Sequence, residues 1–154
     1  MEINGLISPG NVIANLHATS KKQILQELSR RAADLTGEPE RTIFGVLMKR
    51  EQLGTTGVGS GVAIPHGKLQ SIDKLYGIFA RLEQPVDFQS IDERPVDLIF
   101  LLLAPETAGA DHLKALARVS RVLRDSKICT KLRGTDTADA LYAILTEEMK
   151  PEAA

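Results

Sequence analysis

The stretch from Val96 to Leu103 restricts the fold more than any other, because from Leu98 onward its side chains are apolar without interruption. A strand with one face in water alternates apolar and polar residues, whereas a strand covered on both faces does not. The sequence therefore predicts a strand over 96–103 that lies at the centre of its sheet.

Helical periodicity and a second strand precede this segment. Ser20 to Gln23 has the form of a capping box, and apolar residues then recur at helical spacing as far as Gly37, which predicts a helix over about 20–36. Pro39 can occupy the first turn of another helix, which we expect to end near Leu53. A strand is expected over 76–82, followed by a loop that contains Pro85 and Pro95.

Further helical segments follow the central strand. Asp111 can cap a long helix. Its expected inward face consists of Leu113, Leu116, Ala117, Ser120 and Leu123. We expect a short turn over 129–132 and a last helix that is capped by Thr135 or Asp136. The buried face of that last helix is expected to contain Leu141, Tyr142 and Leu145.

The domain organisation follows from length and from this alternation of helices and strands. A chain of 154 residues is close to the size of one domain, and no internal repeat or linker divides it. We expect one α/β domain over 1–154, with an ordered core over approximately 5–147 and a frayed tail over 150–154.

Charge and cysteine content exclude several classes of protein. The chain has 19 basic and 20 acidic side chains, a net charge of −1, so no general field attracts nucleic acid or an anionic membrane. Its longest apolar run is far shorter than the roughly 20 residues that span a bilayer, so we expect no membrane insertion. A single cysteine and the absence of a secretory leader favour the cytoplasm.

His66 is the first candidate for chemistry, because a stiff Pro65 and a permissive Gly67 enclose it. It is either an ordinary turn histidine or a side chain presented at a fixed angle. A loop or glycine-rich strand precedes it, in which backbone N–H groups and two hydroxyls could bind an anion. The candidates in that segment are Thr55, Thr56, Gly57, Gly59 and Gly61, with Arg50 just upstream. Neither a dinucleotide fingerprint nor a P-loop is present, so nucleotide binding is disfavoured.

His112 is the second candidate, at the expected N-terminus of a helix. Position alone indicates a solvent-exposed histidine, but helix N-termini favour anions. If the fold brings His112 to His66, two imidazoles would share one anionic ligand. Zinc would need a third ligand, which no histidine or cysteine spacing offers. Arg50 and Glu51 can also be read as solvated helix-end charges, and Cys129 as a packed side chain.

A larger motif combines these residues. Glu51, Val58-Gly59 and the segment from Val62 to Gly67 resemble the phosphohistidine signature of the mannitol/fructose-type enzyme IIA proteins of the bacterial phosphoenolpyruvate-dependent phosphotransferase system. The nitrogen-regulatory branch of that family is similar over most of the chain. The segments that carry this similarity are 50–57, 79–82, 85–88 and 95–105, and Asp111 to Leu113 matches the place of the family's second histidine.

The resemblance implies a fold and a set of residue roles. It implies a mixed five-stranded sheet flanked by helices, His66 as the phosphorylated nucleophile, His112 as a hydrogen-bond partner of the phosphoryl group, and Arg50 as a stabilising cation. It implies neither a metal nor another cofactor. The donor would be the phosphohistidine of a small phosphocarrier protein, which an enzyme I loads from phosphoenolpyruvate.

Three functions are compatible with these observations. A regulatory carrier would bind target proteins, such as sensor kinases or transporters, according to the phosphorylation of His66. Such a partner would pack on apolar side chains around the site, for which the candidates are Val58, Val62 and Ile64. A sugar-specific enzyme IIA would pass phosphate to a IIB cysteine; Cys129 falls in an expected short helix and offers no second acceptor site. A non-enzymatic anion- or zinc-sensing module is the third possibility.

Overall fold

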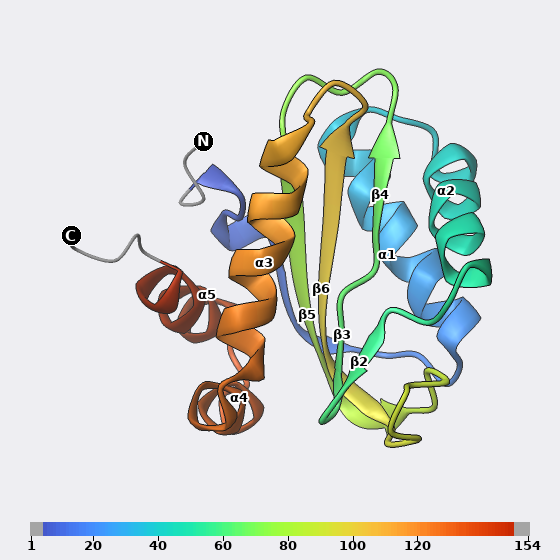
Figure 1. Ribbon diagram of the computed structural model, residues 1–154. Coiled ribbons are helices and arrows are strands. Elements are labelled where there is room, and N and C mark those ends of the chain that lie inside the picture. The colour runs from blue at the N-terminus through green and yellow to red at the C-terminus, as the bar shows by residue number, and fades with distance from the viewer. Residues whose placement is uncertain (1–4, 150–154) are drawn as a thin grey trace.

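Strand β6 (Val96–Pro105) lies in the interior of the sheet, as its apolar run predicts (Figure 1). The computed structural model describes residues 5–149. On one side, β6 pairs antiparallel with β5 (Tyr76–Val86), and on the other it pairs parallel with β3 (Val62–Ala63) and β4 (His66–Leu69). Nearly every side chain of β6 is buried.

The remaining strands extend the sheet on both sides. β1 (Val12–Leu16) runs parallel to β5, and β2 (Gly57–Gly59) runs antiparallel to β3, giving the order β1-β5-β6-β3-β2. β3 and β4 pair with successive parts of β6, because Ile64 and Pro65 interrupt one extended segment. Six strands therefore occupy five positions, and the mixed five-stranded sheet flanked by helices is confirmed.

Helices cover both faces of the sheet. Side chains of α1 (Lys21–Thr36) and α2 (Glu40–Gln52) pack with Ile99, Leu101 and Leu103 of β6. Side chains of α3 (Ala110–Arg124), α4 (Ser126–Arg133) and α5 (Ala138–Glu148) pack with Leu98, Phe100 and Leu102. Alternate residues of one strand thus enter two hydrophobic cores, which explains the uninterrupted apolar run. A short 3₁₀ helix, η2 (Pro9–Asn11), precedes β1.

The first two helices begin and end near the predicted residues. The Ser20 hydroxyl accepts the N–H of Gln23 at 3.1 Å, and Gly37 ends α1 with a φ of 81°. Such a left-handed residue after a helix favours glycine. Pro39 immediately precedes the first residue of α2.

The predicted inward face of α3 was wrong for four of its five residues, and Leu123 is buried as expected. Leu113 and Ala117 are exposed, and Leu116 and Ser120 are half-buried. The buried residues are His112, Ala115, Val119, Val122 and Leu123. The helix is therefore turned by about one residue relative to the prediction, because the largest apolar side chains were assigned inward and a histidine outward. In addition, α3 begins after Gly109, so Asp111 lies in its first turn and is not its cap.

Three smaller predictions also need correction. β5 continues beyond Leu82 and includes Pro85, which was expected in a loop. Residues 129–132 belong to the longer α4, which Asp125 caps, and Thr137 rather than Thr135 or Asp136 caps α5. Of the residues predicted to be buried in α5, Leu141 and Leu145 are buried and Tyr142 is half-buried. The expected frayed tail over 150–154 lies outside the described residues. Within 5–149, no helix has both the length and the apolar character needed to cross a membrane.

Candidate functional site

Three distant segments bring His66, His112 and Arg50 together. His66 begins β4, His112 lies in the first turn of α3, and Arg50 lies in the last turn of α2. β4 and β6 are parallel, and α3 follows the end of β6 after a short loop, so the start of α3 returns toward β4. A pocket of about 630 Å³ lies where these elements meet. It is lined by Val46, Lys49, Arg50, Gln52, Leu53, His66, Gly67, Lys68 and His112.

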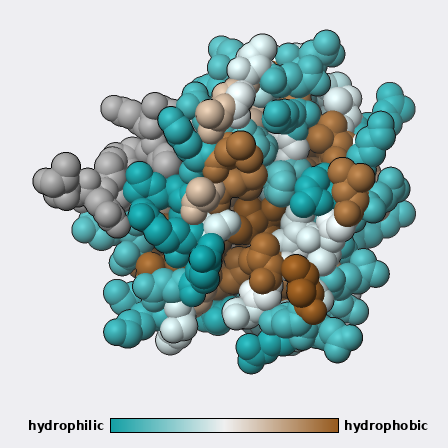
Figure 2. Space-filling view, in the orientation of Figure 1, coloured by the Kyte–Doolittle hydropathy of each residue, from teal (hydrophilic) through white to brown (hydrophobic). Residues whose placement is uncertain are grey.

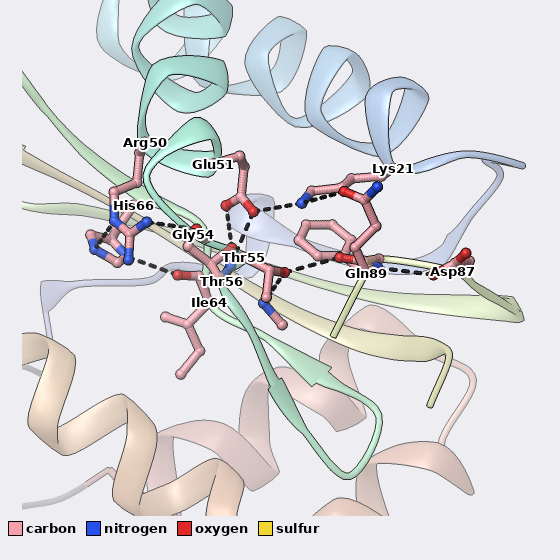
Figure 3. A network of polar contacts seen from close by, with 12 residues as sticks. Lys21, Arg50, Glu51, Gly54, Thr55, Thr56, Ile64, His66, Asp87 and Gln89 are labelled. Carbon is pink, nitrogen blue, oxygen red and sulfur yellow. Dashed lines mark hydrogen bonds and ion pairs between the residues drawn. The ribbon is translucent and has the colours of Figure 1, made fainter. Parts of the chain in front are cut away.

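Two hydrogen bonds fix the ring of His66 (Figure 3). Its Nδ1 lies 2.9 Å from the carbonyl oxygen of Ile64, and its Nε2 lies 3.2 Å from Nε of Arg50. A carbonyl only accepts and a guanidinium only donates, so Nδ1 carries the proton, and the lone pair of Nε2 accepts the hydrogen bond from Arg50. The nucleophilic nitrogen of His66 is therefore Nε2, which faces a cation.

Arg50 is itself held in place. Its Nη1 donates to the carbonyl oxygen of Gly54 at 2.8 Å, just beyond the end of α2. α2 can approach β4 closely because Gly67 has no Cβ. A Cβ at this position would lie only 2.5 Å from Cγ1 of Val46 in α2. Gly67 therefore serves the geometry of the site, since it lets α2 present Arg50 to His66.

His112 is buried, with 6% of its surface exposed, so the exposed position suggested by its place in the helix was wrong. The centroids of the His66 and His112 rings are 5.7 Å apart, with 60° between the ring planes. Nδ1 of His112 is buried and makes no hydrogen bond within the described residues. A buried polar atom without a partner is costly, so it is well suited to receive a ligand oxygen in the pocket.

Both imidazoles are biased toward the neutral form. Burial lowers the pKa of His66 below its ordinary 6.5; Arg50 also lowers it, while the Ile64 carbonyl and the Glu51 carboxylate partly oppose the change. Burial likewise lowers the pKa of His112, with contributions from His66 and Lys68. Burial disfavours a charged ring, and neighbouring cations add to the effect. At neutral pH, His66 therefore keeps its lone pair.

We expect both histidines to titrate with midpoints below 6.5. Because protonation removes the lone pair of His66, any reaction at Nε2 should keep its rate as the pH is lowered from about 8 to 6.5 and slow only in more acid solution. NMR titration of the ring Cε1–H resonances measures the midpoints, with exposed His17 as internal reference. A His66 midpoint above 6.5 would contradict this prediction.

The structure does not bring the glycine-rich segment into the pocket. Gly57, Gly59 and Gly61 belong to the β2–β3 hairpin, in which Gly59, Ser60 and Gly61 all have positive φ. The N–H groups that were expected to meet an anion have other partners: Thr56 donates to Glu51, and Gly57 donates to the Thr55 hydroxyl. Side-chain oxygens of Glu51 and Thr55 therefore occupy these two donors, and the phosphoryl-binding role of the segment stays a prediction.

Sequence analysis missed two features of the site. Lys68 lines the pocket, and its position two residues after His66 on one strand could have indicated this, because such residues share a face. Glu51 was read as a solvated charge, but only 5% of its side chain is exposed. Within 5–149, no three histidine, cysteine or acidic side chains form a group that could hold a metal ion.

Comparisons with known proteins agree with this geometry. The EIIA 2 family of the phosphoenolpyruvate-dependent sugar phosphotransferase system matches residues 5–148. A nitrogen regulatory protein of Bradyrhizobium diazoefficiens is 59% identical over 145 residues, which cover 94% of this chain and 95% of that protein. The crystal structure of nitrogen regulatory protein IIA-Ntr from Neisseria meningitidis has a TM-score of 0.89 at 33% identity, covering 93% of this chain and 98% of that one. A fructose-specific EIIABC component of Bacillus subtilis is 30% identical over 97% of this chain, which covers 24% of that protein.

The chain therefore belongs to the EIIA 2 family and is a IIA-type component of the phosphotransferase system. Within this family it is similar to the nitrogen regulatory proteins, as the motif between Arg50 and Gly67 indicated.

Proposed function

We propose that this protein is a regulatory phosphoryl carrier whose His66 accepts a phosphoryl group from the phosphohistidine of a small phosphocarrier protein. Phosphoenolpyruvate is the ultimate donor, through an enzyme I. The observation that carries the proposal is the unprotonated Nε2 of His66, which lies beside Arg50 in a pocket that is also lined by His112, whose buried Nδ1 has no partner within the described residues.

The chemistry needs little beyond positioning and charge. The Nε2 lone pair attacks phosphorus, a nitrogen–phosphorus bond forms, and the bond to the donor histidine breaks, leaving its electron pair on the donor ring. The transition state is loose and spreads negative charge over three oxygens. Arg50, Lys68 and the N–H of His112 can stabilise that charge, and no metal is needed for this role.

Similarity to nitrogen regulatory proteins supports a regulatory role over sugar transport. The one cysteine gives no sign of being a second acceptor: Cys129 is buried, its thiol donates to the carbonyl oxygen of Leu123, and burial raises its pKa. A buried thiol with a raised pKa is a poor nucleophile. The alternative, a sugar-specific IIA that passes phosphate to a IIB cysteine, rests on the fructose-specific relative. A zinc-sensing module has no support from the grouping of ligands within 5–149.

Partner exchange has a physical basis in the surface around the pocket. Apolar side chains gather across the middle of the face shown in Figure 2, within a mostly hydrophilic surface. Val62 and Ile64, which were candidates for an apolar rim, are buried in the core. The large apolar side chains exposed on the elements around the site are Leu53 on the pocket wall, Val58 on the β2–β3 hairpin and Leu113 on α3. A protein that packs on Leu53 would lie against the pocket that His66 also lines.

We expect phosphorylation to weaken binding of such a partner by about two decades or more. It adds a charge of roughly −2. A partner that buries this charge unpaired loses several kcal/mol, and each 1.4 kcal/mol is about tenfold in affinity. Calorimetric titration of a captured partner against bare and phosphorylated protein measures the change, with Leu113→Ser as a test of the apolar contact. Equal affinities, or rapid transfer from His66 to a IIB cysteine, would favour the sugar-transport function.

A further inference from the structure

A buried ion pair lies behind the site. The Glu51 carboxylate accepts the N–H of Thr56 at 3.0 Å and the Thr56 hydroxyl, and it pairs with Nζ of Lys21 at 2.9 Å. The side chains of Glu51 and Lys21 are only 5% and 16% exposed. Lys21 also lies 4.8 Å from the ring centroid of Phe88. The start of α1, the end of α2 and the start of β2 therefore meet at one carboxylate (Figure 3).

This pair is more than a surface contact between helices. Burying two charges costs free energy that a well-packed apolar pair would not. Removing one partner would leave the other charge buried without a counter-ion. A role beyond stability would explain why ionised groups occupy this position. The hydrogen bonds that connect Thr56 to Ile64 and then to His66 indicate that role.

Glu51 is connected to both nitrogens of His66. On one side, the Thr56 carbonyl accepts the N–H of Ile64 at 2.9 Å, and the Ile64 carbonyl accepts Nδ1–H of His66 at 2.9 Å. On the other side, Glu51 directly follows Arg50, whose Nε donates to Nε2 of His66. Fixing Glu51 therefore fixes the acceptor at Nδ1 and the donor at Nε2.

We propose that Glu51, held by Lys21, is a positioning residue that keeps His66 in its Nδ1–H tautomer with Nε2 facing the incoming phosphoryl group. This inference rests on the proposed function. Glu51 does not touch the reacting atoms; it acts through Thr56 and Ile64 and through the last turn of α2. An error of about 1 Å at a reacting group can cost about 10²-fold in rate, so loosening this frame should slow transfer.

The charge of Glu51 supplies a second signature. Its carboxylate raises the pKa of His66, against burial and Arg50. The other charged or titratable groups at the pocket are Lys49 of α2, Lys68 of β4 and His112 of α3. Because a carboxylate favours the imidazolium, Glu51→Gln should lower the pKa of His66 further. This change reports the charge of Glu51, while the tautomer of His66 reports its positioning role.

The test compares Glu51→Gln and Lys21→Met with Glu27→Gln, which removes the exposed Glu27–Arg30 pair of α1. Ring ¹⁵N shifts report the tautomer of His66, its NMR titration reports the pKa, and rapid-quench transfer from the phosphorylated phosphocarrier gives the saturating rate and KM. For Glu51→Gln we expect mixed tautomers, a lower midpoint and a saturating rate reduced by about tenfold or more, with KM unchanged. We expect mixed tautomers and a similar rate loss for Lys21→Met, and no change for Glu27→Gln.

A wild-type tautomer, midpoint and saturating rate in Glu51→Gln would overturn the inference, as would a loss confined to KM. If Glu51→Gln does not fold, Lys21→Met decides, and a fixed Nδ1–H tautomer with a wild-type rate in that variant would overturn the inference. Failure of the wild-type protein to accept phosphate would instead refute the proposed function, while the tautomer measurement would still test the positioning role.

Discussion

His66→Ala is expected to abolish phosphoryl labelling while leaving the domain folded. The substitution removes the nitrogen that forms the bond to phosphorus, and neither Arg50 nor His112 replaces it: a guanidinium has no lone pair to give, and the His112 ring is centred 5.7 Å from the His66 ring, away from the position of Nε2. The His66 side chain is only half-buried and belongs to neither hydrophobic core, so its loss should disturb packing little.

Intact-mass measurement after incubation with phosphoenolpyruvate, enzyme I and phosphocarrier protein tests this expectation. His17→Ala is the matched control, because His17 is exposed and lies outside the pocket, and it should be labelled like the wild type. Urea unfolding of both variants verifies that they fold. Full labelling of His66→Ala would refute the assignment of the nucleophile.

Arg50→Ala and His112→Ala should each slow transfer by about 10²-fold or more without eliminating it. Each removes one preorganised donor from a partly buried pocket, and removal of a single donor of this kind costs about 10²–10³ in rate. Arg50 has the additional role of orienting Nε2, since it donates directly to that atom. Nucleophilic attack itself stays possible in both variants because His66 is retained.

Rapid-quench measurement of single-turnover rates shows whether Arg50 and His112 contribute to phosphoryl transfer. Arg30→Ala is a suitable control, since Arg30 lies on the exposed face of α1 and forms an ion pair with Glu27 of the same helix. Wild-type rates in Arg50→Ala and His112→Ala would mean that the two side chains are ordinary helix-end residues.

Elements with strong local signals could be predicted from the sequence. α1 has a capping serine, a regular apolar stripe and a terminal glycine, and it begins and ends within a residue of expectation. β6 was recognisable because both of its faces are buried. The family motif identified His66, His112 and Arg50, and the structure brings all three to one pocket.

Features that depend on tertiary packing could not be predicted in the same way. The rotation of α3 is set by contacts of Ala115 and Val119 with the sheet, while the larger Leu113 is left exposed beside the pocket. The segment after Thr56 was read as a loop or a glycine-rich strand that could bind an anion, and pairing with β3 makes it part of a hairpin. Glu51 looks like any charge at a helix end until Lys21, thirty residues earlier in the chain, is placed against it.

The most direct test of the account is to locate the phosphoryl group on the wild-type protein. ³¹P and long-range ¹H–¹⁵N NMR of the enzymatically phosphorylated protein identify both the residue and the ring nitrogen that carries phosphorus. Because Nδ1 of His66 is held by the Ile64 carbonyl, the account predicts a single phosphoramidate on Nε2 of His66. Phosphate on His112, on Nδ1 of His66 or on any other residue would contradict it.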